Sequence, residues 1–309
     1  MLVSEVGLGC NNFGMRIDLE GTRKVVAKAL DLGVTFFDTA DNYGNFGGSE
    51  TLLGEVLGSQ RQNIVLATKF AAPMAPGETR KKASRHYIMS AVEASLRRLK
   101  TDWIDLYQLH YHDELTPIEE TLRALDDLVK HGKVRYIGCS NMLPWHVVEA
   151  QWTSRHLNLH RFVSMQAEYS VVVREIEREL LPALQAYNIG LLPYFPLASG
   201  LLTGKYSRTS PPPPDTRFSA WQRLGDRYAT DANWDAVEHL RSFCAARGKG
   251  MLELAFNWLL AKPVVSSVIA GATKPEQVEQ NVAAVGWKLT PEDLAEIDKM
   301  PRGFAPPLS

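Results

Sequence analysis

The stretch that organises this chain covers residues 36–50 and reads FFDTADNYGNFGGSE. Residues 34–37 have the apolar, β-branched and aromatic composition of a buried strand, and they run directly into the carboxylate of Asp38. Tyr43 follows in a loop rich in Gly and Asn, and a helix is predicted to begin at Ser49. A charged group at the end of a buried strand is costly unless it is paired. We therefore expect a partner for Asp38 from another part of the chain.

Length and composition are those of an ordinary globular protein. The chain has 309 residues, of which 45% are hydrophobic and 22% charged, with a formal net charge of -1. This balance gives no support for nucleic acid or an anionic membrane as a partner. The three cysteines are too few and too scattered for a disulfide framework or a zinc site, and no signal peptide or membrane-spanning apolar run is recognisable. We expect a soluble, cytoplasmic protein; its oligomeric state stays open.

Strand and helix patterns alternate along the chain. Strands are predicted at residues 6–10, 34–37, 64–68, 103–109, 134–139, 162–166, 189–193 and 264–269, with helical periodicity between them. A doubly wound sheet is the rival architecture, but Gly7-Leu8-Gly9 is not continued by the third glycine that a dinucleotide-binding turn requires. We therefore predict an α/β fold in which residues 1–309 form one (β/α)₈ TIM barrel.

Two segments lie outside this repeat. Lys205 to Asp235 contains four consecutive prolines and follows the seventh strand, so it is expected at the mouth of the barrel as a lid or a pocket wall, with a solvated connector as the alternative. Residues 290–309 are expected to form a short capped helix and a tail. Capping boxes are also expected at Thr116, with proline at the first helical position, and at Thr273.

Three successive predicted strands end in a titratable residue. These residues are Asp38, Lys69 and His110. In a parallel barrel the carboxyl ends of the strands share one mouth, where the chemistry of such folds takes place. Each residue alone has an ordinary explanation, such as a surface lysine or a structural histidine, but the three together favour a functional cluster. Tyr43 joins it from the loop after the second strand.

This cluster suits proton transfer to a polar bond. An unperturbed tyrosine has a pKa of about 10, which is high for proton exchange at neutral pH. A lysine cation beside Tyr43 is expected to lower that pKa, with Asp38 holding the lysine charged and in place. His110 can orient a carbonyl oxygen or relay its proton. The arrangement predicts reduction of a carbonyl by a hydride that a cofactor supplies.

A metal site is the alternative, because His110-Tyr111-His112-Asp113 contains two histidines that a strand would place on one face. Metal-dependent barrels need further His and Asp ligands from other strands. The other strand ends carry mainly amides and apolar residues. We therefore predict no catalytic metal.

The next strand ends supply groups for a nicotinamide ring. The fifth strand leads to Ser140 and Asn141, the sixth ends in Gln166, and the seventh in Tyr194. Amides and a hydroxyl can bracket a neutral carboxamide, and the face of a tyrosine stacks on a planar ring. Ser140 and Asn141 alone are common turn residues, but the set of four indicates a nicotinamide site.

Two stretches are suited to phosphate. After the eighth strand, the predicted helix start at Thr273 presents backbone N–H groups, and Lys274 adds a cation. A hydroxyl and a cation at a helix start suit a phosphate monoester, which favours NADPH over NADH. The glycine-bearing stretch Ser199–Lys205, after the seventh strand, can wrap a pyrophosphate.

At these positions the chain resembles the aldo-keto reductase superfamily, in particular its bacterial members related to the potassium-channel β-subunits. The resemblance covers nearly the whole chain and rests on Gly7-Leu8-Gly9, Phe13-Gly14, Phe37-Asp38-Thr39-Ala40, Tyr43, Gly48-Ser49-Glu50, Thr68-Lys69, residues 105–110, Gly138-Cys139-Ser140-Asn141, Pro196-Leu197, residues 200–205 and residues 271–281.

The resemblance implies a barrel that reduces aldehydes and ketones without a metal. It makes Asp38, Tyr43, Lys69 and His110 the family's catalytic tetrad, with Tyr43 as the general acid. It implies NADPH as cofactor, with NADH possible. The residues expected to contact the cofactor are Ser140, Asn141 and Gln166 at the carboxamide, Tyr194 on the ring, Leu197, Gly200, Leu202, Gly204 and Lys205 along the loop, Gly271, Thr273, Lys274 and Gln277 near the 2′-phosphate, and Gln280 and Asn281 at the adenine.

The substrate side of the pocket is expected to include Asn11, Phe46, Phe70, Tyr111 and part of the 205–235 insertion. A mostly aromatic lining fits aryl or medium apolar carbonyls, but also sugars stacked on aromatic faces. Gln277 stands where some relatives carry arginine, which leaves NADH open. Two other functions therefore stay open: an NAD(P)-dependent aldose dehydrogenase, and a nucleotide-sensing regulatory subunit with little turnover.

Overall fold

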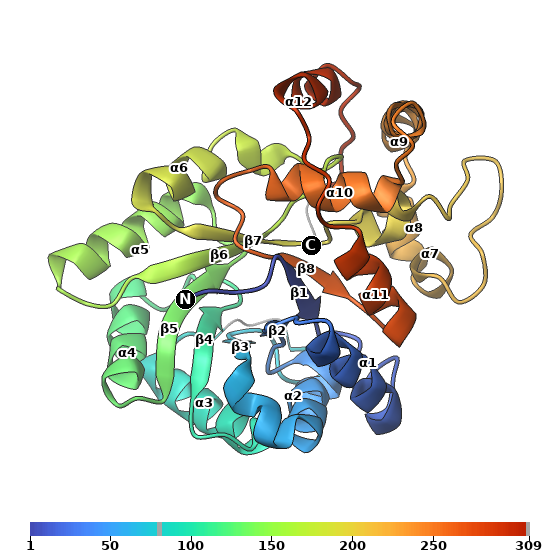
Figure 1. The fold of residues 1–309 in the computed structure, drawn as a ribbon. Helices are drawn as coiled ribbons and strands as arrows, with labels where there is room; N and C mark the ends of the chain where they lie inside the picture. Colours follow the sequence, from blue (N-terminus) through green and yellow to red (C-terminus); the bar gives the residue numbers. More distant parts are fainter. Residues whose placement is uncertain (79–81, 307–309) are drawn as a thin grey trace.

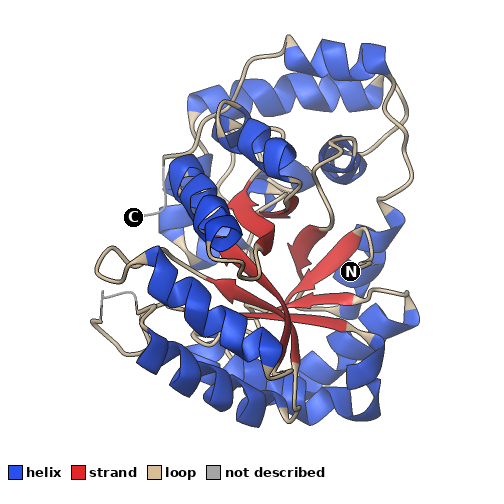
Figure 2. Ribbon diagram, turned by 90° about the vertical axis from the view of Figure 1, so that its left-hand side faces the viewer, coloured by secondary structure: helices blue, strands red, loops and turns tan. Residues whose placement is uncertain are grey.

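Eight parallel strands form one sheet in the computed structural model, which describes residues 1–78 and 82–306, in the order β7-β6-β5-β4-β3-β2-β1-β8. The strands lie inside and the helices outside (Figures 1 and 2). This confirms the predicted (β/α)₈ barrel. The strands are β1 Val6–Gly9, β2 Phe36–Asp38, β3 Val65–Phe70, β4 Ile104–Leu109, β5 Val134–Ser140, β6 Phe162–Glu168, β7 Gly190–Tyr194 and β8 Val268–Gly271.

The helices that connect and cover these strands follow them along the chain. They are α1 Leu19–Asp31, α2 Tyr43–Leu57, α3 Arg85–Leu99, α4 Ile118–Lys130, α5 Pro144–His156, α6 Leu180–Tyr187, α7 Arg217–Ala220, α8 Gln222–Tyr228, α9 Asp231–Ala245, α10 Met251–Leu260, α11 Pro275–Ala283 and α12 Pro291–Asp298. Short 3₁₀ turns lie at Gly58–Asn63, Glu175–Glu177 and Ala198–Thr203. Among the described residues, none of these helices combines the length and the apolarity needed to cross a membrane.

The sheet closes between β7 and the residues just before β8. The backbone N–H of Leu191 donates to the carbonyl of Val264 (2.7 Å), and that of Ser266 donates to the carbonyl of Leu191 (2.9 Å). The prediction placed the whole eighth strand at residues 264–269, but β8 begins at Val268 and ends at Gly271, paired with β1. The predicted strand therefore overlaps β8 at Val268 and Ile269 and begins too early, although Val265 forms an isolated parallel bridge with Leu191.

Alternation along the strands separates two layers of side chains. A small cluster of Phe36, Ala67, Leu106, Leu192 and Ile269 fills the barrel interior. The apolar residues directly before or after them in the sequence belong to the larger core between strands and helices. Because successive side chains of a strand point to opposite faces, the residues two positions further along β2, β3 and β4 also face the interior, at the mouth of the barrel. This placement prepares the site described below.

Two predicted capping boxes are absent, because each helix begins one residue later than expected. The N-cap of α4 is Pro117, and the hydroxyl of Thr116 donates instead to Asp113 Oδ2 (2.7 Å). The N-cap of α11 is Lys274 without a side-chain cap. The N–H and the hydroxyl of Thr273 donate instead to Gln277 Oε1 (2.7 and 3.2 Å).

The insertion and the tail are both folded against the barrel. The predicted 205–235 segment contains α7, α8 and the start of α9. The expected final helix is α12, whose capping box joins Thr290 and Asp293. Within the expected tail, residues 307–309 lie outside the described part of the chain.

Candidate active site

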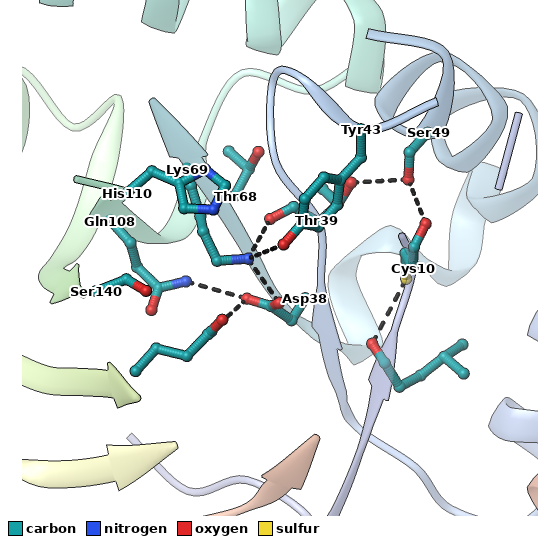
Figure 3. A network of polar contacts seen from close by, with 12 residues as sticks. Cys10, Asp38, Thr39, Tyr43, Ser49, Thr68, Lys69, Gln108, His110 and Ser140 are labelled. Atoms are coloured by element: carbon teal, nitrogen blue, oxygen red, sulfur yellow. Dashed lines mark hydrogen bonds and ion pairs between the residues drawn. The ribbon is translucent and has the colours of Figure 1, made fainter. Parts of the chain in front are cut away.

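The four residues of the predicted cluster come together at the mouth of the barrel (Figure 3). Asp38 is the last residue of β2, Lys69 lies near the end of β3, and His110 directly follows β4. Tyr43 begins α2, after a segment whose backbone continues the sheet: the N–H of Asp41 donates to the carbonyl of Lys69 (3.0 Å). In the parallel register Asp38 pairs with Ala67 and Lys69 pairs with Gln108, so Lys69 and His110 each lie two residues beyond the partner of the preceding catalytic residue, on the same inward face.

Lys69 is the partner that Asp38 requires. Its side chain is fully buried, and its Nζ donates to Asp38 Oδ2 (2.7 Å), to the carbonyl of Thr39 (2.9 Å) and to the hydroxyl of Tyr43 (3.4 Å). An ammonium group has three donors, and each one has an acceptor here. The lysine is therefore held with its charge directly beneath the phenol.

The second oxygen of Asp38 is held by two amides. Gln108 Nε2 donates to Oδ1 at 3.1 Å, and Gln166 Nε2 donates to the same atom at 2.9 Å. Gln108 was not among the predicted site residues. Its position two residues before His110, on the inward face of β4, is the signal that could have identified it.

The pKa values of the cluster favour a protonated tyrosine. Burial raises the pKa of the Tyr43 hydroxyl, and the Lys69 cation acts against this rise without reversing it. The predicted lowering of the Tyr43 pKa by Lys69 is present, but desolvation outweighs it, so the pKa is raised overall. Burial alone would lower the pKa of Lys69, but Asp38 and Tyr43 raise it overall. The site therefore holds a charged lysine and a phenol that keeps its proton at neutral pH.

His110 is neutral in this environment. Burial, with the Lys69 charge adding to it, holds the pKa of the imidazole well below its usual value. The ring meets Tyr43 edge to face, with centroids 5.8 Å apart, and stacks on Tyr111 at 4.6 Å. His112 lies apart from it, stacked on His146 at 3.9 Å. The two histidines of the H-x-H pair thus have separate surroundings, and His110 is available as a neutral hydrogen-bonding group.

A cavity of about 590 Å³ connects this cluster with the loops after β7 and β8. Predicted residues that line it are Asn11, Asp38, Tyr43, His110, Tyr111, Ser140, Asn141, Gln166, Tyr194, Leu197, Gly200, Lys205, Gly271, Thr273, Gln277, Gln280 and Asn281. Lys69, Phe46, Phe70, Leu202, Gly204 and Lys274 are not among its lining residues.

Two of the predicted substrate residues lie elsewhere. Phe70 is fully buried and stacks on Tyr107, with ring centroids 4.7 Å apart, in the layer between strands and helices. Its neighbour Lys69 takes the inward position, so alternation turns Phe70 outward. Phe46 is 41% exposed on the turn after Tyr43. Of the four predicted substrate residues, Asn11 and Tyr111 line the cavity.

The middle of the cavity carries a connected set of polar groups. Asn141 Nδ2 donates to the carbonyl of His110 (3.2 Å) and to Ser140 Oγ (3.0 Å), while its Oδ1 accepts from the hydroxyl of Tyr194 (2.8 Å). These residues stand at the ends of β5 and β7. An amide and hydroxyls that already exchange hydrogen bonds can exchange them with a carboxamide as well.

The far end of the cavity is positively charged, and the insertion contributes to it. Arg16 and Arg217 both line the cavity, and neither was predicted. A Cβ on Gly271 would lie 3.2 Å from Arg217 Nη2, so the guanidinium reaches the end of β8. Burial, and then the charge of Arg16, lower the pKa of Arg217. Guanidinium groups beside the N-terminus of α11 suit phosphate oxygens, so these residues fit an elongated dinucleotide.

The insertion is anchored beside this cavity. Arg227 of α8 makes a two-pronged ion pair with Glu168 at the end of β6 (2.8 and 2.6 Å), and its Nε donates to the carbonyl of Pro306 (2.6 Å). The hydroxyl of Tyr228 also bonds to Glu168. Residues 215–217 of the same segment line the cavity and form part of its wall. Movement of the segment as a lid stays a prediction.

Comparisons with known proteins agree with this geometry. The model of the aldo/keto reductase family matches residues 5–302. The chain is 35% identical to a probable voltage-gated potassium channel subunit beta from Oryza sativa subsp. japonica, over 96% of this chain and 92% of that protein. It is 34% identical to L-glyceraldehyde 3-phosphate reductase from Escherichia coli (strain K12), over 94% and 86%. It is 32% identical to versiconal hemiacetal acetate reductase from Aspergillus parasiticus, over 98% and 96%.

Proposed function

Because this chain belongs to the aldo/keto reductase family and is an oxidoreductase, we propose that it reduces aldehydes or ketones to alcohols with NADPH, and that Tyr43 donates the proton. The observation that carries this proposal is the position of the Lys69 ammonium group between Asp38 Oδ2 (2.7 Å) and the Tyr43 hydroxyl (3.4 Å). A buried cation beneath a phenol stabilises the phenolate that forms when the proton leaves.

The residues of this chain divide the reaction between them. The reduced nicotinamide, when bound, supplies the hydride to the carbonyl carbon. Neutral His110 holds the carbonyl oxygen by a hydrogen bond, and Tyr43 transfers its proton to that oxygen as negative charge develops there. Lys69 then faces the phenolate, and Asp38 keeps the lysine charged and in place. Asn11 and Tyr111, which line the cavity, are proposed to contact the substrate.

The cofactor is proposed to lie along the cavity with its ring beside this cluster. Ser140, Asn141 and Gln166 would hold the carboxamide, and Tyr194 would stack on the ring. The remaining lining residues at the loop after β7 and at residues 271–281 would hold the phosphates and the adenosine, with Arg217 adding charge. Preference for NADPH is proposed from Thr273, which lines the cavity at the start of α11, and from the cation of Lys274, which follows it in the chain but is not a lining residue.

A regulatory role is the second candidate, and the 35% identity to a probable potassium channel subunit beta favours it. Such a role predicts tight cofactor binding, very slow turnover and a stable assembly with another protein. The cluster geometry does not separate the two candidates, because a nucleotide sensor can keep a catalytic site. Turnover does separate them.

The test is oxidation of NADPH by a reactive aromatic aldehyde, followed by the absorbance of the reduced cofactor. Tyr43→Phe is expected to lower turnover by about 10²–10⁴-fold, while quenching of tryptophan fluorescence reports unchanged NADPH affinity. Tyr187→Phe, a surface tyrosine that accepts a hydrogen bond from Trp152, is the matched control and should behave like wild type. Wild-type turnover in Tyr43→Phe would refute the assignment. Tight binding without turnover on any carbonyl would favour the regulatory role.

A further inference from the structure

The chain immediately after Tyr43 forms a turn in an unusual conformation. Four successive residues have positive φ angles: Gly44 (67°), Asn45 (59°), Phe46 (66°) and Gly47 (116°). Residues other than glycine rarely adopt this left-handed region. Such conformations persist when the surrounding structure fixes them, and they gather at functional sites. The contacts that hold residues 44–47, called here the left-handed turn, therefore bear on the position of Tyr43.

One side of the left-handed turn is pressed against the loop after β1. A Cβ on Gly44 would lie 2.4 Å from the carbonyl oxygen of Phe13, so glycine alone fits this approach. Ser49 fastens the same loop to the start of the regular helix, because its hydroxyl donates to the carbonyl of Cys10 (2.8 Å) and bonds to the hydroxyl of Thr39 (2.8 Å; Figure 3).

The other side of the left-handed turn is covered by Arg98 of α3. A Cβ on Gly47 would lie 2.7 Å from Arg98 Cδ, which shows that the arginine side chain lies directly on the turn. Arg98 Nε donates to Glu50 Oε2 at 2.7 Å, three residues beyond Gly47. The carboxylate of Glu50 is fully buried. Arg98 therefore contacts both ends of the short segment that leads from the turn into the helix.

Glu50 connects this contact to the strand that carries the lysine. Its second oxygen, Oε1, accepts a hydrogen bond from the hydroxyl of Thr68 (2.5 Å). Thr68 precedes Lys69 on β3 and points to the opposite face (Figure 3). A chain of contacts thus runs from Arg98 through Glu50 to Thr68, whose neighbour is the hydrogen-bond partner of Tyr43.

We propose that Arg98, through its ion pair with Glu50, is a positioning residue for Tyr43: it clamps the left-handed turn so that the phenol oxygen stays within hydrogen-bond distance of Lys69. This inference rests on the proposed function, in which Tyr43 is the proton donor. A buried ion pair often adds little to stability compared with apolar side chains, whereas it fixes one geometry between the groups that it joins.

The experiment compares neighbouring arginines on α3. Arg98→Met keeps an apolar arm on the left-handed turn but leaves Glu50 as an unpaired buried charge, which can prevent folding. The double variant Arg98→Met/Glu50→Gln removes that charge and keeps an acceptor for Thr68. Arg97→Met, at an exposed position of the same helix, is the control.

For the double variant we expect turnover to fall by about 10–100-fold, because a small misplacement of a reacting group costs this much, with NADPH affinity unchanged. Arg97→Met should match wild type.

A double-mutant cycle separates positioning from general loss of structure. If Arg98 acts through Tyr43, the Arg98→Met/Glu50→Gln change should alter the residual turnover of Tyr43→Phe by less than about twofold, because no proton donor remains to be positioned. An equal fold loss in both backgrounds, or wild-type turnover in the folded double variant, would overturn the proposal while the assignment of Tyr43 stands. Wild-type turnover in Tyr43→Phe would instead refute the proposed function, and this inference with it.

Discussion

The two sides of the cavity are built in different ways. The side formed by the ends of β2, β3 and β4 consists of buried side chains that lock one another, and every Lys69 donor has an acceptor within 3.4 Å. The side formed by the loop after β7, the insertion and the start of α11 consists of irregular backbone and Arg217, with three of the five residues from Phe195 to Ser199 in left-handed conformation. Arg16, from the loop after β1, adds a second guanidinium group. The first side fixes the positions of the few atoms proposed to react, whereas the second side lines the elongated part of the cavity.

This difference indicates a division of labour. Proton transfer needs donor and acceptor held within hydrogen-bond reach, and buried, fully paired groups achieve this. An extended, charged ligand needs many moderate contacts along its length instead. Changes on the first side should therefore alter turnover, and changes on the second side should alter cofactor affinity. The following predictions test whether the two sides can be separated in this way.

The largest effect is expected for Lys69→Met. Removing the ammonium group leaves Asp38 as an unpaired buried charge, so the free energy of unfolding should fall by about 3–5 kcal/mol. Turnover should fall by about 10³-fold, since Tyr43 loses the cation that stabilises its phenolate. Chemical denaturation and the aldehyde assay measure the two effects. Lys249→Met, which removes a surface pair with Glu253, serves as control. Full activity in a folded Lys69→Met protein would contradict the role given to Lys69.

A smaller and different effect is expected for Arg217→Met. The guanidinium lines the cavity next to Gly271 at the end of β8, whereas the catalytic cluster stands at the ends of β2, β3 and β4. The dissociation constant of NADPH should rise by about 10-fold, because one charge-assisted contact is lost. Turnover at saturating cofactor should change little. Fluorescence titration measures the affinity, with Arg241→Met on the surface of α9 as control. A loss of turnover without a loss of affinity would show that the two sides are not separate.

Gln277→Arg should change cofactor choice. Gln277 Oε1 accepts from both the N–H and the hydroxyl of Thr273. Replacing Gln277 by arginine therefore frees these two donors and adds a cation at the start of α11. The affinity for NADPH relative to NADH should increase by about 10-fold. Titration of wild type and variant with both cofactors measures the ratio. An unchanged ratio would place the 2′-phosphate elsewhere.

The smallest effect is expected from pH. The pKa of His110 lies well below its usual value, and burial raises that of Tyr43. Neither group then changes its charge between about pH 6 and about pH 8, so turnover should vary by less than about twofold there. Stability should decline as the pH falls below about 6.5, because the unfolded chain binds a proton at this histidine that the folded protein does not. An inflection of turnover near pH 6.5 would show that His110 titrates during catalysis.

The sequence predicted the first side of the cavity better than the second. Asp38, Lys69 and His110 were identifiable because strand ends in a barrel converge, so position along the chain determines position in space. Gln108 was missed although the same alternation rule applies to it. The lowering of the Tyr43 pKa by Lys69 was predicted, but the burial that outweighs it was not, because the depth of burial depends on packing by residues far away in the sequence.

The second side was predicted less well because loops do not follow a repeat. Arg217 comes from the insertion, and only the fold shows that this segment reaches back to Gly271. On the first side, the prediction that Phe70 lines the pocket was wrong, because one step along the strand from Lys69 reverses the face. The connection between β7 and β8 contains α7, α8, α9 and α10, whereas a strand–helix repeat leads one to expect a single helix there.

The most direct measurement uses NADPH that carries deuterium at both hydrogen positions of C4 of the nicotinamide and an aromatic aldehyde, with the alcohol analysed by mass spectrometry. The account predicts an alcohol that carries deuterium on its carbinol carbon, formed by wild type and by Tyr187→Phe at equal rates and about 10²–10⁴-fold more slowly by Tyr43→Phe. An alcohol without deuterium, or equal rates for wild type and Tyr43→Phe, would contradict it.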